Sequence, residues 1–67
     1  MELEYVIEVE ERSEDGVMHT VVTLGRYGDW GEAVDTARAL SGCLKCDLDV
    51  VVYEYGEYEN GIEVYRL

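Results

Sequence analysis

Residues 2–10 alternate between acidic and apolar side chains, and this alternation constrains the fold more than any other feature of the chain. In ELEYVIEVE, one set of alternate positions is apolar and consists of Leu3, Tyr5, Ile7 and Val9. The other set carries carboxylates, with Val6 among them, at Glu2, Glu4, Glu8 and Glu10. Successive side chains of a strand point to opposite faces of a sheet, so the pattern predicts a half-buried strand with an acidic, solvated face.

A second strand follows a polar turn. The segment from Glu11 to Gly16 is polar and ends in Asp-Gly, which is a turn signal, and strand-forming residues continue from Val17 to Leu24. We expect a hairpin whose inward side chains are Met18, Val22 and Leu24. Its outward side chains are then His19, Val21 and Thr23.

One helix is predicted in the middle of the chain. Asp29 is suited to cap its N-terminus, and Glu32, three positions later, completes a capping-box-like arrangement. An apolar stripe with helical spacing follows, made of Trp30, Ala33, Val34, Ala37, Leu40 and Leu44. Gly42 is placed to end the helix as the residue just beyond its C-terminal cap, a position that favours a left-handed backbone.

Two further strands are predicted after the helix, over residues 47–55 and 62–67. Asn60-Gly61 between them is a strong hairpin signal because both residues tolerate positive φ. A strict two-residue turn conflicts with the apolar phase of the two strands, so we expect Gly56 to mark a bulge or an irregular loop. Residues 1–67 are therefore predicted to form a single α+β domain of ββαββ order, with a mostly antiparallel four-stranded sheet and one helix on one face. The other face is left to solvent or to a partner.

Sixteen acidic residues against five basic ones give a formal net charge of −11 and a pI near 4.1. A chain with this charge repels nucleic acid and anionic membranes, and its field steers it toward basic protein surfaces. Crowding of like charges is also expected to raise carboxylate pKa values. The sequence shows neither a signal peptide nor an apolar run long enough to cross a membrane, which predicts a cytoplasmic protein.

No set of residues that catalysis requires is recognisable. His19 is the only histidine, so we predict that the protein is not an enzyme and holds no cofactor. Cys43 and Cys46 form a CxxC motif, but it follows a helix C-terminus, where the helix dipole does not favour a reactive thiolate. We expect two inert thiols and no metal. A local disulfide and a four-cysteine zinc site shared by two chains are the alternatives.

Glutamates and tyrosines are the residues best suited to a binding surface. Glutamates at alternate strand positions lie about 6.6 Å apart, which is on the scale of successive phosphates along a nucleic-acid strand. Tyrosine offers a large contact area with few rotatable bonds and a polar tip. The predicted partner-binding residues are Glu2, Glu4, Glu8, Glu10, Tyr53, Tyr55, Glu57, Tyr58, Glu59, Glu63 and Tyr65.

The segments ELEYVIEVE, DWGEAVDTARAL and VYEYGEYENGIEVY carry a resemblance of type, without a shared motif. In size, acidity and predicted ββαββ order, the whole chain resembles the small phage-encoded inhibitors of bacterial defence, especially anti-CRISPR proteins. The resemblance implies an inhibitor that acts as a nucleic-acid mimic and occupies a channel of its partner lined by lysine and arginine.

Two other readings fit the sequence. The open face of the sheet is also suited to joining two copies as a homodimer, and a single lysine beside sixteen acids is typical of halophilic adaptation. Acids gathered on one face would favour mimicry, acids spread evenly would favour halophilic adaptation, and a flat apolar face would favour a homodimer.

Overall fold

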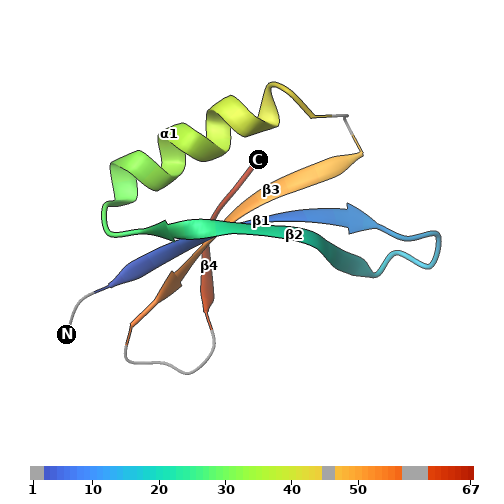
Figure 1. Ribbon diagram of the computed structural model, residues 1–67. Coiled ribbons are helices and arrows are strands. Elements are labelled where there is room, and N and C mark those ends of the chain that lie inside the picture. The colour runs from blue at the N-terminus through green and yellow to red at the C-terminus, as the bar shows by residue number, and fades with distance from the viewer. Residues whose placement is uncertain (1–2, 45–46, 57–60) are drawn as a thin grey trace.

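The computed structural model describes residues 3–44, 47–56 and 61–67. Its elements are β1 (Glu4–Arg12), β2 (Met18–Tyr27), α1 (Trp30–Ser41), β3 (Leu48–Tyr55) and β4 (Ile62–Arg66). Neighbouring strands are antiparallel in the order β2-β1-β3-β4, and α1 lies along one face of the sheet (Figure 1). The predicted α+β fold of ββαββ order is confirmed. In the part of the chain that the structure describes, α1 falls short of the length and apolarity that a membrane crossing requires.

The turn between β1 and β2 lies where the Asp-Gly signal predicts it. Gly16 adopts a φ of +84°, in the left-handed region that glycine enters without strain. The backbone N–H of Gly16 donates to the Ser13 carbonyl at 2.9 Å, and the Asp15 carboxylate accepts from the Val17 N–H at 3.1 Å. The acidic side chain thus closes the turn itself, which explains why aspartate precedes the glycine.

Two bulges interrupt β2, with Val21 and Gly25 as the extra residues opposite β1. Gly25 has a φ of +23°, which again favours glycine. Leu24 faces α1 and packs against the core, as predicted, and Val21 is 59% exposed, as predicted for an outward residue. Val22 lies on the helix side but stays 43% exposed, because α1 packs mainly over β1 and β3 and leaves much of this edge strand uncovered.

The core lies between α1 and the two central strands. Its residues of zero exposed fraction on this side are Ile7, Val50 and Val52 of the sheet and Ala33 and Ala37 of the helix. Trp30, the first residue of α1, remains 41% exposed. Its ring packs edge-on against Tyr5, with 5.7 Å between ring centroids, and against Tyr65, with 6.0 Å. The predicted apolar stripe from Trp30 to Leu40 is therefore the buried side of the helix, with Trp30 at its rim, whereas Leu44 lies beyond the end of α1 and packs against the core from there.

Both ends of α1 lie at the predicted residues. The Asp29 carboxylate accepts a hydrogen bond from the Glu32 N–H at 2.9 Å, which confirms the N-cap. Gly42 caps the C-terminus, but with φ −66° and ψ −17°, so the expected left-handed backbone is wrong. The chain continues instead in a tight right-handed turn, in which the Cys43 N–H donates to the Leu40 carbonyl at 3.0 Å.

β4 pairs with β3 through a bulge that the sequence did not predict. Tyr65 lies opposite Val52 and Glu63 opposite Tyr53, which leaves Val64 as the extra residue. Residues two apart in a strand normally share a face, but the bulge places Tyr65 and Glu63 on opposite sides of the sheet.

Gly56 follows the end of β3 as a bend. Asn60 of the predicted turn lies outside the described residues.

Candidate partner-binding surface

The sheet face away from α1, which we call the open face, carries most of the predicted partner-binding residues that the structure describes. Residues directly opposite each other in an antiparallel sheet point to the same side, so the register defines this face. Its members are Glu4, Val6, Glu8, Glu10 and Arg12 of β1, Met18, Thr20, Thr23 and Arg26 of β2, Asp49, Val51, Tyr53 and Tyr55 of β3, and Glu63 and Arg66 of β4. The predicted inward direction of Met18 is therefore wrong, and so is the outward direction of His19, which lies opposite Glu11 on the helix side. Glutamates and tyrosines that are far apart in the sequence are thereby brought onto one surface.

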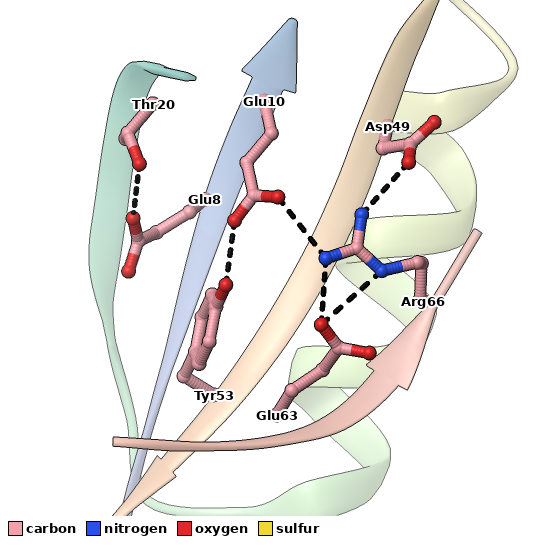
Figure 2. Close-up of polar contacts among 7 residues, drawn as sticks. All are labelled: Glu8, Glu10, Thr20, Asp49, Tyr53, Glu63 and Arg66. Carbon is pink, nitrogen blue, oxygen red and sulfur yellow. Dashed lines mark hydrogen bonds and ion pairs between the residues drawn. The ribbon is translucent and has the colours of Figure 1, made fainter. Parts of the chain in front are cut away.

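Arg66 forms the centre of an ionic cluster on the open face (Figure 2). One guanidinium nitrogen, Nη1, contacts Asp49 Oδ2 at 2.7 Å. The other, Nη2, contacts Glu63 Oε1 at 2.6 Å and Glu10 Oε1 at 3.1 Å. The second Glu10 oxygen accepts a hydrogen bond from the Tyr53 hydroxyl at 2.5 Å. The cluster thus joins β1, β3 and β4 across three neighbouring strands.

Glu10 is a buried carboxylate, which corrects its predicted place in an exposed acidic row. The residue is only 5% exposed, because the side chains of Tyr53 and Arg66 lie across it. A carboxylate can be buried at modest cost only when it is paired and hydrogen-bonded, and both oxygens of Glu10 meet this condition. Glu10 therefore holds the sheet together and is not available as a phosphate-like group.

Sequence reasoning missed Arg66, the residue on which this cluster depends. In an unbroken strand Glu63 and Arg66, three positions apart, would point to opposite faces. The bulge at Val64 turns them to the same face, and it leaves no clear mark in the sequence. The available signal was weaker: Arg66 is the only base that follows Lys45, in a segment rich in acids.

The contacts in the cluster shift the pKa values of its members. The hydrogen bond from Arg66 holds the pKa of Glu63 below its usual value, and the same bond raises the pKa of Arg66. Loss of solvation, followed by the hydrogen bond to Glu10, raises the pKa of Tyr53. A bond from Ser13 lowers the pKa of Asp15 as well. The expectation that crowding raises carboxylate pKa values is therefore wrong for Glu63 and Asp15.

Two glutamates of the predicted row retain accessible carboxylates. Glu8 is half-buried and accepts a hydrogen bond from the Thr20 hydroxyl at 2.8 Å. Glu4 lies 3.6 Å from an Arg26 nitrogen, and the two side chains are 49% and 78% exposed. Such an exposed, long ion pair is weak, so Glu4 keeps most of its capacity to bind another cation.

Tyr65 does not lie with the other predicted tyrosines. It is on the helix side of the sheet, where its ring packs against Trp30 and its hydroxyl accepts a hydrogen bond from Arg38 Nε at 3.2 Å. Tyr53 and Tyr55 are on the open face, and both are half-buried. The bulge at Val64 accounts for this separation.

Four of the predicted partner-binding residues, Glu2, Glu57, Tyr58 and Glu59, lie outside the described residues.

Acidic residues occur on several surfaces besides the open face. Glu14 and Asp15 occupy the β1–β2 turn, and Asp29, Glu32 and Asp35 lie at the start and on the exposed side of α1. On the open face itself, most of the described acids lie beside an arginine, either Arg26 or Arg66. The negative charge is therefore distributed over the molecule.

Of the two cysteines in the CxxC motif, the structure describes only Cys43. Cys43 is exposed and makes no disulfide, and Cys46 lies outside the described residues. Over residues 3–44, 47–56 and 61–67, no three His, Cys, Asp or Glu side chains come together in a way that could hold a metal ion.

Comparison of the chain with protein-family models, with curated proteins and with solved structures finds no match.

Proposed function

We propose that the protein is a non-catalytic binding protein whose open face docks on a basic, nucleic-acid-binding surface of a partner protein and blocks it. The observation that carries this proposal is the composition of the open face. Accessible carboxylates of Glu4 and Glu8 lie there beside the rings of Tyr53 and Tyr55, with Glu63 partly exposed at the Arg66 cluster, on a side of the sheet that α1 leaves uncovered.

We expect electrostatic attraction to bring the partner to the open face, and tyrosine rings to make the main contacts once it is bound. A net charge of −11 accelerates encounter with a basic surface, most strongly at low ionic strength. Tyrosines then supply contact area that is compatible with water before binding. The ionic cluster around Arg66 fixes the relative positions of β1, β3 and β4, so the binding groups are held in place before the partner arrives.

In its most specific form the proposal is an anti-CRISPR-like inhibitor that acts as a nucleic-acid mimic in the cytoplasm of a phage-infected cell. The support for that form is the small, acidic ββαββ chain.

Two alternatives to this proposal are a homodimer and halophilic adaptation. A homodimer through the open face is disfavoured by the charged groups at its centre, since burying them requires exact pairing. Halophilic adaptation is favoured by one observation, the acids in the β1–β2 turn and along α1. The experiment must therefore separate the position of the charges from their number.

The test compares two charge reversals of equal size. Glu4→Lys with Glu8→Lys changes the open face, whereas Glu14→Lys with Asp35→Lys changes the turn and the outer side of α1. We expect the parent to capture basic nucleic-acid-binding proteins from a lysate, added DNA or RNA oligonucleotides to displace them, and only the open-face variant to lose capture. Equal loss in both variants, or simultaneous binding of oligonucleotide and protein, would contradict the proposal.

A further inference from the structure

A groove of about 440 Å³ opens on the open face, away from the Arg66 cluster. Its lining residues are Glu4 and Val6 of β1, Thr23, Gly25 and Arg26 of β2, and Tyr55 of β3. The bulge at Gly25 belongs to this groove, and bulges commonly redirect the neighbouring side chain. Here the neighbour is Arg26, whose guanidinium lies near Glu4.

The lining combines three features that an arginine side chain needs. Glu4 offers a carboxylate to the guanidinium fork, Tyr55 offers an aromatic ring for a cation–π contact, and Val6 offers an apolar floor for the methylene stem. Lysine would use the carboxylate but, as a compact and strongly hydrated charge, would gain less from the ring. The groove is thus matched to a guanidinium more than to an ammonium group.

Arg26 indicates that the groove accepts a guanidinium group. The groove holds the Arg26 guanidinium only loosely. Its nitrogen is 3.6 Å from the Glu4 carboxylate, and its side chain is 78% exposed. In the Arg66 cluster the corresponding contacts to Glu63 and Asp49 are 2.6 and 2.7 Å. A charge-assisted hydrogen bond is about 2.7–2.9 Å long, so the bond that Glu4 can make is not made by Arg26.

We propose that this groove binds an arginine side chain of a basic partner, which takes the place of Arg26 at Glu4 and lies against Tyr55 and Val6. This inference rests on the proposed function and names the chemistry by which the open face recognises its partner. Arg26 then acts as an internal competitor that the partner's arginine displaces.

The test uses hexa-arginine and hexa-lysine peptides as probes of equal charge, with binding followed by amide chemical shifts of the folded protein. We expect hexa-arginine to bind about two- to five-fold more tightly, the gain of an exposed cation–π contact, with the largest shifts at Val6, Thr23 and Gly25. Tyr55→Leu should remove this preference and Tyr55→Phe should keep it. Dispersed spectra of both variants verify that the fold is intact.

Removal of the internal competitor gives the sharpest comparison. Arg26→Ala and Arg12→Ala lower the net charge equally, but only the first frees Glu4. We expect Arg26→Ala to strengthen hexa-arginine binding about 1.4- to 5-fold more than Arg12→Ala, the range set by an exposed ion pair.

Equal affinity for the two peptides, or equal effects of the two arginine variants, would overturn the arginine groove and leave the proposed function standing. Failure of both peptides to bind at low salt would overturn the proposed function itself.

Discussion

Replacement of Arg66 by methionine should destabilise the protein strongly, because it leaves the Glu10 carboxylate buried without a cation. Methionine has a similar length and keeps part of the apolar contact of the arginine stem. Among the described residues, Arg66 contacts three acids: the Glu10 side chain is only 6% exposed, whereas those of Asp49 and Glu63 are 31% and 44% exposed. The effect should therefore come mainly from Glu10.

The magnitude follows from the exposure of each partner. Removing one member of a buried ion pair costs about 3–5 kcal/mol, and an exposed pair contributes about 0.2–1 kcal/mol. The Arg66 side chain is itself 34% exposed, and Tyr53 still donates to Glu10 in the variant. We expect a loss of about 2–3 kcal/mol, between these limits. A domain of this size has about 3–5 kcal/mol in total, so the variant should be close to unfolding.

Urea denaturation followed by circular dichroism measures this loss, with Arg12→Met as a control that removes the same charge from an exposed strand end. The control should change the free energy of unfolding by less than about 0.5 kcal/mol. Adding Glu10→Gln to Arg66→Met removes the stranded charge and keeps an acceptor for Tyr53, so the double variant should be more stable than Arg66→Met alone. The reasoning is refuted if Arg66→Met costs no more than Arg12→Met, or if Glu10→Gln destabilises further.

Three other outcomes are expected. Ile7→Ala should cost about 2–4 kcal/mol, because Ile7 has no exposed surface and its loss opens a cavity, and the urea midpoint followed by circular dichroism should fall well below that of the parent; an unchanged midpoint would contradict this. Gly61→Ala should cost about 1–3 kcal/mol and shift the Tyr55 ring resonances, since the added Cβ would lie 2.5 Å from Tyr55 Cζ; unchanged ring shifts would contradict this. Because the folded pKa of Glu63 is lowered, its contribution to stability is present above its ordinary pKa and is lost as pH falls through the lower folded value; the carboxyl carbon of Glu63 should titrate at lower pH than in Arg66→Met.

The elements could be predicted because local signals specify them. Alternation in β1, the Asp15-Gly16 turn and the Asp29 cap each act over a few residues, and each is found where the sequence places it. The face of the sheet without a helix was also predictable, because one helix cannot cover both sides of a four-stranded sheet.

The details of the candidate site depended on long-range pairing and were missed. A single extra residue, Val64, decides which faces Tyr65 and Arg66 occupy, because a shift of one position in a strand reverses its faces. The burial of Glu10 depends on Tyr53 and Arg66, which are far from it in sequence. Alternation alone predicts the same exposure for Glu8 and Glu10. Only the side chains contributed by neighbouring strands make Glu10 the more buried of the two.

The central position of β1 has a consequence for how the chain reaches its native state. β1 must pair with β3, and Glu10 bonds to a residue 56 positions away, so the sheet cannot close until the second half of the chain has arrived. The first hairpin forms from local contacts, but Ile7 is buried only when α1 packs over it and Val52 pairs beside it in the sheet. Folds dominated by such distant contacts form slowly, because loop-closure entropy is lost before the contacts compensate for it. During synthesis the first hairpin therefore emerges from the ribosome before β3 can pair with β1 and complete the core. Glutamates on the other side of β1 are of the kind that protects an unpaired strand from aggregation, and we expect them to do so here.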